Sequence, residues 1–557
     1  MLRKLLSKWY FCAVALIISG AVSAAALVQT ELGVVQWISL IPTGLVLLSI
    51  SADRTVRLRR VYLFGWLFFA SYFLVIYSWI LSMYPLDFTG ISRPLAATFV
   101  FGAWIGLSAF FSALFALAFV FVAMLSRARL GSEHKLIAPL AFALLWVAFE
   151  WGQTLHWSGV PWGRLCLGQV DVPYMLNGSA ILGSYFVTFS IVFVNATVAQ
   201  IILRTDGRRL SAITAAFVFT LNLTLGIISC ALSDGALDKA SQKINVAVIQ
   251  ANISTVEKWA SGNELTNTIE RYDRLTMEAA QKGADIVIWS ETALPVSLYD
   301  YPTVGFQMSR IAQKYGVTLV TGIFTDVYTE DAPPIYYNSV IAYDKNGALC
   351  DQVYHKRHLV PFGEFIPYRD LMLKVFPFLG EIEMLGYDLT PGDSSTVLSV
   401  DGLNIGAIIC FDSIYEDATL DAATGGAQFI AMATNESWFD SSYALKMLND
   451  QARLRAIECG RYIARSANTG ISSIVSPNGE VVCELEKLTE GDCIAELSLI
   501  DPKDSYNTPY SLVGNLFVYL SLAVLVALFL HGCLTETTIF KRISIKHEHN
   551  KKRNTDT

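Results

Sequence analysis

Long apolar stretches separated by short polar loops occupy the first 234 residues of the chain. Each has close to the roughly 20 apolar residues that an α-helix needs to cross the hydrocarbon core of a bilayer. Their limits, together with those of a further stretch near the C-terminus, are residues 9–29, 33–51, 61–82, 97–125, 136–152, 179–203, 210–232 and 511–533. The stretch at 136–152 is the weakest, because Glu150 lies within its end. This pattern predicts an α-helical transmembrane bundle of about eight spans.

Lysine and arginine residues alternate with these stretches. Basic clusters precede the first stretch and follow the second, fourth, sixth and eighth, whereas the other connections hold few basic residues. By the positive-inside rule the clusters are cytoplasmic, so the long segment after the seventh stretch lies on the opposite side of the membrane. The predicted units are a seven-span bundle at 1–234, an external domain at 235–505, an eighth transmembrane helix at 506–534 and a basic cytoplasmic tail at 535–557. A cleaved signal peptide at 1–29 is the alternative, and it would leave seven spans.

The external segment has a different pattern, in which short β-branched runs alternate with amphipathic stretches. Strands are predicted at 244–250, 285–289 and 317–323, and helices at 264–283 and 306–314. Strands and helices that alternate at this spacing are typical of α/β layers around a buried sheet. About 270 residues suffice for one large domain.

Composition agrees with a membrane protein. The 557 residues are 53% hydrophobic and 16% charged, whereas a soluble globular chain carries about 25% charged residues. The net charge of −7 is mild and leaves no basic footprint for nucleic acid. The middles of the apolar stretches hold almost no charge, which argues against a transporter with paired intramembrane charges.

Three reactive side chains each adjoin an apolar strand pattern in the external segment. Glu291 ends the run from Asp285, Lys356 follows Val353, and Cys410 follows the run from Gly406. A carboxylate can deprotonate a thiol, the thiolate can attack a carbonyl carbon, and an ammonium can stabilise the oxyanion that forms. Each residue alone has a plainer explanation, such as a small buried cysteine, a carboxylate at a helix N-terminus or a surface lysine. Together they predict an acyl-transfer site.

Motifs around these residues resemble the nitrilase superfamily and, more narrowly, the apolipoprotein N-acyltransferase family. In chain order they are Glu150–Trp151, Gly159–Trp162, Leu182–Tyr185, Val248–Ile253 with Trp259, Ser290–Glu291, His355–Pro367, Gly406–Cys410, Ala433–Phe439 and Arg461–Gly470. The resemblance covers nearly the whole chain. It implies a nitrilase-like αββα sandwich carried on the transmembrane bundle, in a bacterial inner-membrane enzyme whose catalytic domain faces the periplasm.

The resemblance also implies the reaction. A fatty acyl chain would pass from a phospholipid to the Cys410 thiol, and then to the N-terminal amine of a diacylglyceryl-cysteine apolipoprotein, which completes lipoprotein maturation. Glu364 would orient Lys356 or share the acid–base work. Trp259, Asn435 and Trp438 would be supporting or substrate-facing residues, with core packing an equal alternative for Trp438. No cofactor is expected, because thiol acyl transfer requires none, and a monomer is expected.

A membrane-tethered amidase of the nitrilase type is the alternative function. It would use the same three residues but pass the acyl group to water. The transmembrane bundle favours the acyltransferase, because a phospholipid donor needs lateral access to the site. His355 and His358 flank Lys356, but no further His or Cys follows at ligand spacing, so no metal is expected.

The chain departs from the family pattern beside the nucleophile. The usual Tyr-Glu is replaced by Phe411 and Asp412, and the usual Asp-Ala before Trp438 is replaced by Glu436 and Ser437. Phe411 lacks a hydroxyl, and the Asp412 side chain is one methylene shorter than a glutamate. These changes indicate either a shifted acceptor preference or local repacking, of which repacking is favoured.

Two expectations concern the membrane boundary. Glu150 and Arg164 are expected at the outer interface, where they would meet lipid head groups or water. Trp151, Trp157 and Trp162 are expected in an interfacial aromatic belt.

Two further expectations concern the external domain. The apolar segment 376–386 is either a lid that touches the bilayer or part of the core. Cys483 and Cys493 flank a predicted turn, and they can pair across two strands in an oxidising compartment.

Overall fold

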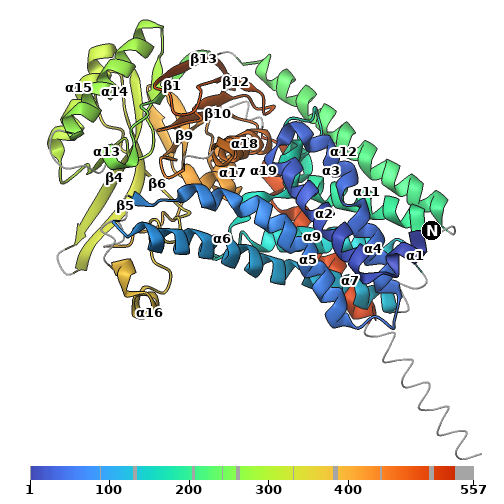
Figure 1. Ribbon diagram of the computed structural model, residues 1–557. Helices are drawn as coiled ribbons and strands as arrows, with labels where there is room; N and C mark the ends of the chain where they lie inside the picture. Colours follow the sequence, from blue (N-terminus) through green and yellow to red (C-terminus); the bar gives the residue numbers. More distant parts are fainter. Residues whose placement is uncertain are drawn as a thin grey trace, which may run out of the picture.

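The chain folds into a helical bundle and a two-sheet α/β domain that pack against each other (Figure 1). The computed structural model describes residues 2–87, 90–128, 134–203, 207–240, 242–258, 264–329, 332–380, 387–439, 442–500 and 507–532. Trp259, the predicted tail at 535–557 and residues 381–386 of the apolar segment lie outside the described residues.

The N-terminal part is helical, as the apolar pattern predicts. Its elements are α1 (Leu2–Leu6), α2 (Trp9–Val28), η1 (Thr30–Val35), α3 (Gln36–Ser39), α4 (Ile41–Ala52), α5 (Leu58–Ile76), η2 (Tyr77–Met83), α6 (Arg93–Phe115), α7 (Leu117–Arg127), α9 (Ile137–Gly152), η4 (Pro161–Gly163), η5 (Leu165–Gln169), α10 (Ser179–Leu182), α11 (Ser184–Leu203) and α12 (Arg208–Leu237). In the described part of the chain, six helical segments are long and apolar enough to cross a membrane. Two shorter apolar helices, Ile137–Gly152 and Leu516–Gly532, occupy the positions of the predicted fifth and eighth spans.

Small residues allow close approach between the helices of the bundle. At Gly20 of α2, a Cβ atom would collide with the backbone oxygen of Phe68 on α5. At Gly44 of α4, a Cβ atom would lie 2.7 Å from the Cβ of Ala199 on α11. Such backbone contact supplies van der Waals packing where lipid offers no hydrophobic drive for association.

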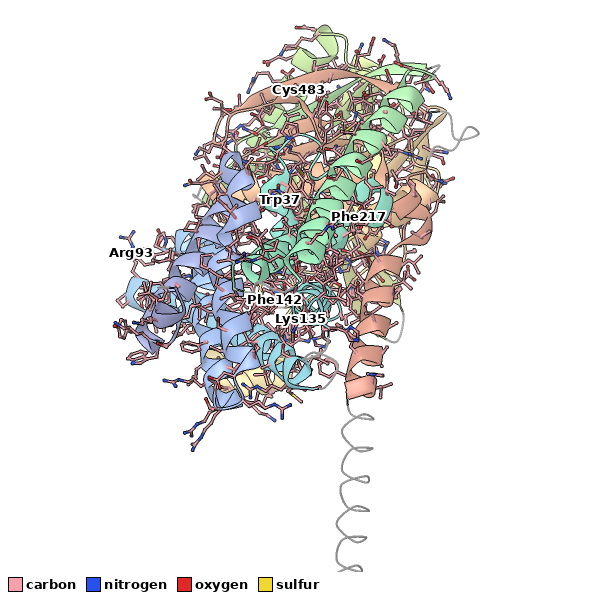
Figure 2. All side chains as sticks on the ribbon, turned by 90° about the vertical axis from the view of Figure 1, so that its right-hand side faces the viewer. Trp37, Arg93, Lys135, Phe142, Phe217 and Cys483 are labelled. Carbon is pink, nitrogen blue, oxygen red and sulfur yellow. A yellow bond between two sulfur atoms is a disulfide. The ribbon has the colours of Figure 1, made fainter. Side chains whose placement is uncertain are left out.

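Helix α12 lies along the outside of the bundle, where Phe217 projects from it (Figure 2). The Phe217 side chain is 64% exposed. An apolar helix with this exposure has a surface suited to lipid, which agrees with a multi-pass membrane protein.

The α/β domain contains two sheets. One has the strand order β13-β1-β2-β4-β5-β6, with β3 beside β4, and the other has the order β12-β11-β10-β9-β8-β7. The strands are β1 (Gln242–Gln250), β2 (Ile286–Ile288), β3 (Leu294–Ser297), β4 (Thr318–Thr329), β5 (Ala332–Tyr343), β6 (Tyr354–His355), β7 (Val397–Val400), β8 (Leu403–Ile409), β9 (Phe429–Thr434), β10 (Tyr462–Ala467), β11 (Ser473–Val475), β12 (Val481–Glu484) and β13 (Gly491–Leu499). The helical elements are α13 (Thr255–Lys258), α14 (Glu264–Gln281), α15 (Pro302–Tyr315), α16 (Arg369–Val375), η6 (Pro377–Gly380), η8 (Cys410–Ile414), α17 (Asp417–Thr424), α18 (Ser442–Cys459) and α19 (Pro509–Val513).

Alternation along the strands sorts their side chains into layers. In β1, Val246 and Val248 join the core between the two sheets, whereas Ala247 and Ile249 pack under helices α14 and α15. In the second sheet, Ile408 and its neighbours pack under α17 and α18. Because successive strand residues point to opposite faces, a sheet covered on both sides needs apolar residues at every position. This arrangement confirms the predicted αββα sandwich.

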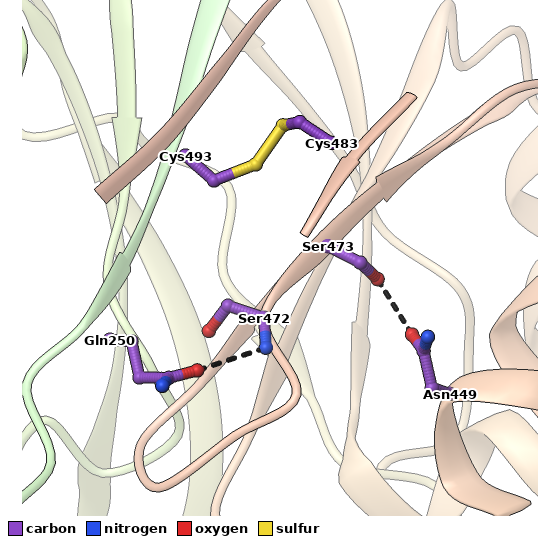
Figure 3. Close-up of a disulfide and its surroundings, with 6 residues drawn as sticks. All are labelled: Gln250, Asn449, Ser472, Ser473, Cys483 and Cys493. Carbon is purple, nitrogen blue, oxygen red and sulfur yellow. Dashed lines mark hydrogen bonds between the residues drawn. A yellow bond between two sulfur atoms is a disulfide. The ribbon is translucent and has the colours of Figure 1, made fainter. Parts of the chain in front are cut away.

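A disulfide joins Cys483 of β12 to Cys493 of β13 (Figure 3). The two strands belong to different sheets. The bond therefore clamps one edge of the sandwich, and the pairing that the sequence left open is present. In the perpendicular view Cys483 lies at the end of the molecule remote from Lys135 (Figure 2).

Helix α18 holds the domain against the bundle. Its Gln451 side chain donates to the Trp162 carbonyl over 3.1 Å, and Arg453 pairs with Asp171 at 2.6 Å. The Tyr443 hydroxyl shares a 2.7 Å hydrogen bond with Ser78. These contacts attach one helix of the second sheet to three separate segments of the membrane half.

A buried ion pair completes this attachment. Arg164, which is 1% exposed, donates to the carboxylate of Glu416, and the carboxylate also accepts from Tyr185 at 3.2 Å and from Asn515 at 2.9 Å. Burial alone would raise the pKa of Glu416, but Arg164 and Arg455 outweigh it and lower that pKa to about 2. Glu416 therefore stays ionised between the two halves.

The expectations for Glu150, Arg164 and Trp162 at the membrane boundary were wrong, whereas Trp151 and Trp157 are partly exposed. Glu150 is 2% exposed and accepts hydrogen bonds from Trp146, the Leu165 backbone and Thr188, so it joins three segments of the bundle rather than meeting water. Arg164 is also buried, and it pairs with Glu416. Trp162 is also buried, with its ring stacked 4.4 Å from that of Trp79. The sequence could not show this, because the partners come from distant segments.

We expect Arg164→Met to weaken the attachment of the two halves. The change leaves Glu416 buried beside Arg455 alone, and breaking a buried ion pair costs about 3–5 kcal/mol of folding free energy. Unfolding of the detergent-solubilised protein, followed by circular dichroism, measures the loss. Arg310→Met, at an exposed arginine of α15, is the matched control and should change stability by less than about 0.5 kcal/mol.

Equal stability of the two variants would contradict this role for Arg164.

The ion pair between Arg164 and Glu416 also makes stability depend on pH. Because the pKa of Glu416 is depressed from 4.5 to about 2, its contribution is present above about pH 4.5 and is lost as pH falls toward 2.

Candidate active site

Cys410 lies directly after the carboxyl end of β8, an inner strand of the second sheet. Its φ is +46°, in the left-handed region, and the 3-10 turn η8 starts there. A non-glycine residue in this region carries about 1–3 kcal/mol of strain, which the surrounding structure must hold. The Asp412 carboxylate does so in part, since it accepts a 3.0 Å hydrogen bond from the Ile409 backbone.

Glu291 follows strand β2 of the other sheet and is 5% exposed. Its Oε1 atom accepts hydrogen bonds from Lys356 Nζ at 2.9 Å and from Asn338 at 2.7 Å. Its Oε2 atom accepts one from the Asn435 backbone at 2.8 Å. The carboxylate is thus fixed by three donors and keeps one unused lone-pair direction on Oε2.

Lys356 lies between two carboxylates. Its Nζ atom is 2.9 Å from Oε1 of Glu291 and 2.9 Å from Oε1 of Glu364, and the residue is 1% exposed. Burial opposes the charge, but the two carboxylates outweigh it and hold the pKa of Lys356 well above its ordinary value. Burial and the neighbouring Glu291 raise the pKa of Glu364, against the pull of Lys356. Asn338 donates to both carboxylates and holds them in register.

The structure brings Cys410 into the same group. Burial raises the pKa of the Cys410 thiol, Glu291 raises it further, and Lys356 opposes them. The resting thiol is therefore neutral, and it needs a base to become a nucleophile. Glu291, Lys356 and Cys410 are positioned by both sheets, so the site spans the sandwich.

Asp412 ties the turn of Cys410 to the segment of Lys356. Its carboxylate accepts from the Tyr354 hydroxyl at 2.8 Å and from the His358 backbone at 2.8 Å. Tyr354 and His358 lie two residues before and after Lys356, so one buried carboxylate helps to position both the Cys410 turn and the Lys356 segment. Phe411 is 8% exposed, and its ring lies 5.7 Å from that of Tyr415. Its packing in the core fits local repacking.

The other predicted residues differ in position. Asn435 is buried at the site, where its backbone contacts Glu291 and its side chain accepts from Asn468 at 3.1 Å. Trp438 is partly exposed, which fits either a substrate-facing residue or partial packing against the core. Trp259 lies outside the described residues. In the described start of the 376–386 segment, Phe376 is 40% exposed, whereas Leu379 packs against a small hydrophobic cluster around Ile366.

Sequence reasoning missed Lys258. It is 5% exposed, and its Nζ atom donates to the Glu291 backbone carbonyl at 2.9 Å. Burial lowers the pKa of Lys258 to about 7, against the attraction of Glu291 and Cys410. Its place beside Trp259 in the Val248–Trp259 motif was the available signal. Asn338 and Thr434 were also missed, because neither stands out in a strand pattern.

Side chains that could bind a metal do not cluster in the described ranges. Within them, no group of three or more His, Cys, Asp or Glu side chains is placed to hold a metal ion. His355 shares a hydrogen bond with Ser339, and His358 one with Asp417.

Comparison with known proteins covers both halves of the chain. Residues 245–503 match the family model described as carbon-nitrogen hydrolase, and residues 19–197 match that of the apolipoprotein N-acyltransferase N-terminal domain. An amidase of the nitrilase superfamily from Nesterenkonia aligns over 46% of this chain and 90% of its own, at 18% identity and a TM-score of 0.35.

Curated relatives are similar over most of their length. The apolipoprotein N-acyltransferase of Allorhizobium ampelinum is 30% identical over 78% of this chain and 79% of its own length. That of Sinorhizobium medicae is 31% identical over 77% of this chain and 78% of its own length. With both domain models matched in order and these relatives spanning them, the chain belongs to the apolipoprotein N-acyltransferase family.

Proposed function

We propose that this protein transfers a fatty acyl chain from a phospholipid to the N-terminal amine of a diacylglyceryl-cysteine apolipoprotein, through a thioester on Cys410. The observation that carries the proposal is the group formed by Glu291, Lys356 and Glu364 beside the Cys410 thiol, in a domain attached to a membrane bundle. Relatives named apolipoprotein N-acyltransferase support the same reaction.

In the first half-reaction Glu291 takes the thiol proton, and the thiolate attacks the ester carbonyl of the phospholipid. The tetrahedral intermediate carries an oxyanion, which the Lys356 ammonium stabilises. When the intermediate collapses, the lysophospholipid alkoxide leaves and takes the proton from Glu291. The acyl chain then remains on Cys410 as a thioester.

In the second half-reaction the apolipoprotein amine attacks the thioester. The amine gives up a proton to Glu291 as the new amide bond forms, and Lys356 again faces the oxyanion. The thiolate leaves and recovers the proton, which regenerates the resting site. Glu364 and Asn338 hold Lys356 and Glu291 in place through both steps.

We extend the proposal to the setting of this chemistry. The units are a bundle at 1–234, a periplasmic catalytic domain at 235–505, a last transmembrane helix at 506–534 and a cytoplasmic tail at 535–557. The enzyme would act as a monomer in the bacterial inner membrane. The alternation of basic loops supports this orientation.

Mass spectrometry of the Cys410 peptide tests the reaction. After incubation of the detergent-purified protein with phospholipid, we expect a fatty-acyl mass on Cys410 that hydroxylamine removes. Addition of a diacylglyceryl-cysteine peptide should move that mass to the peptide amine. Cys410→Ser should abolish the hydroxylamine-sensitive adduct, whereas Cys350→Ser, at a free cysteine of the same domain, should leave it intact.

An adduct that passes only to water would identify a membrane-tethered hydrolase instead. No adduct at all from phospholipid would refute the proposed donor.

We expect Lys356→Met to slow formation of the thioester by about 10²–10³-fold, the usual cost of removing one oxyanion donor. Single-turnover acylation with saturating phospholipid measures the rate. Lys345→Met, at an exposed lysine of the same domain, is the matched control and should keep the rate of the unaltered enzyme. A Lys356→Met rate within twofold of that control would exclude Lys356 from the chemistry.

A further inference from the structure

A second acidic group reaches the Cys410 thiol by way of Thr434. Strands β8 and β9 are parallel, and Ile409 is paired with Ala433. Cys410 and Thr434 are the next residues of the two strands, so they are neighbours at the carboxyl ends of β8 and β9. The Thr434 side chain acts on the Cys410 thiol and lowers its pKa, and the Thr434 hydroxyl donates to Oε1 of Glu436 over 2.7 Å.

Glu436 is fully buried and incompletely paired. Its Oε1 atom accepts from Thr434 and from the guanidinium of Arg465 on β10, whereas Oε2 has no hydrogen-bond partner among the described residues. A buried carboxylate oxygen without a donor disfavours the ionised form. Burial raises the pKa of Glu436 to about 7, against the charge of Arg465. This acid can therefore exchange a proton near neutral pH.

We propose that Thr434 and Glu436 form a second path for the Cys410 proton, parallel to Glu291. The thiol proton passes to Oγ1 of Thr434 while the hydroxyl proton of Thr434 passes to Oε1 of Glu436. The products are a thiolate that accepts a hydrogen bond from Thr434 and a neutral Glu436 acid that donates to Thr434. Net charge is unchanged, and no further reactant is needed.

Occupancy of Glu291 explains how a second acceptor would help. Two donors already occupy Oε1 of Glu291 and one occupies Oε2. In the proposed function Glu291 must also serve the leaving alkoxide and the incoming amine. The inference rests on the proposed function only for the purpose of this second proton path. The existence of the path can be tested without any acyl substrate.

The residue at 436 also differs from the usual family pattern, in which aspartate occupies this place. A glutamate side chain extends one methylene further, and here its tip reaches the Thr434 hydroxyl. The segment Thr434–Glu436 therefore serves both proposed proton acceptors. It carries Glu436 itself, and the Asn435 backbone donates to Glu291.

Other charges face the two groups and contribute to any pH profile. Those near Cys410 are Glu291, Lys356, Lys258 and Glu436, and those near Glu436 are Arg465 and Glu291. The ionised form of Glu436 raises the pKa of the Cys410 thiol by repulsion. A purely electrostatic role for Glu436 therefore predicts that its removal speeds thiolate reactions, whereas a proton path predicts that removal slows them.

The experiment is the pH dependence of Cys410 alkylation by iodoacetamide in the full-length, detergent-purified protein, followed by peptide mass spectrometry. In the unaltered protein the rate should rise through about pH 7 as Glu436 becomes able to accept the proton. Glu436→Gln and Thr434→Val should each lower the rate near pH 8 by roughly 10-fold and remove that step. Above about pH 10, where hydroxide deprotonates the thiol directly, Glu436→Gln should match or exceed the unaltered protein.

Thr434→Ser retains the hydroxyl and should restore both the rate and the step near pH 7. Thr419→Val, which removes another fully buried hydroxyl, should leave the profile unchanged. A Glu436→Gln rate at pH 8 equal to or above that of the unaltered protein would overturn the proposal, as would equal rates for Thr434→Val and Thr434→Ser. Because Thr434→Ser preserves the Arg465–Glu436 pair, the comparison of the two Thr434 variants still decides the matter if Glu436→Gln does not fold. Acyl transfer itself plays no part in these readouts, so they can fail while the proposed function holds, or the reverse.

Discussion

A guanidinium removed from water must be paired with carboxylate to be tolerated, and Arg164 meets this requirement by reaching from the membrane half into the α/β domain. Its partner Glu416 lies six residues after Cys410, just beyond the turn that carries the proposed nucleophile. The pair therefore joins the bundle to the segment directly after the turn that starts at Cys410, not to a remote surface. Tyr185 and Asn515 share the same carboxylate, so α11 and the segment before the last apolar helix are held at the same point.

The proposed chemistry depends on that attachment. An acyl chain that arrives from a bilayer must meet the Cys410 sulfur, so the height and orientation of the turn relative to the bundle set where the ester can react. Helix α18 supports the same alignment, since it contacts three segments of the membrane half and packs under the second sheet. The two halves thus act as one positioning unit.

Within the proposed site, opposite charges lie beside a neutral thiol. One ammonium lies between two carboxylates, and the partly exposed Cys410 beside them keeps a neutral thiol. In the tetrahedral intermediate the oxyanion would compete for the ammonium of Lys356, so this group is placed to respond to charge that exists only during reaction. Thr434 and Glu436 would add a reversible acceptor for the thiol proton at the carboxyl end of strand β9.

Much of this protein was determined by local pattern. Apolar stretches predicted the helices, short β-branched runs predicted the buried strands that contain Val246 and Ile286, and strand ends marked Glu291, Lys356 and Cys410. These features follow from periodicity and side-chain chemistry, which any single segment expresses by itself. Contacts between distant segments were decided only by the tertiary structure. Arg164 and Glu416 are 252 residues apart, and the register of β8 on β9 alone makes Thr434 a neighbour of Cys410. Burial of a charge or a hydroxyl depends on what the rest of the chain brings to it, and that information is absent from the segment that carries the residue.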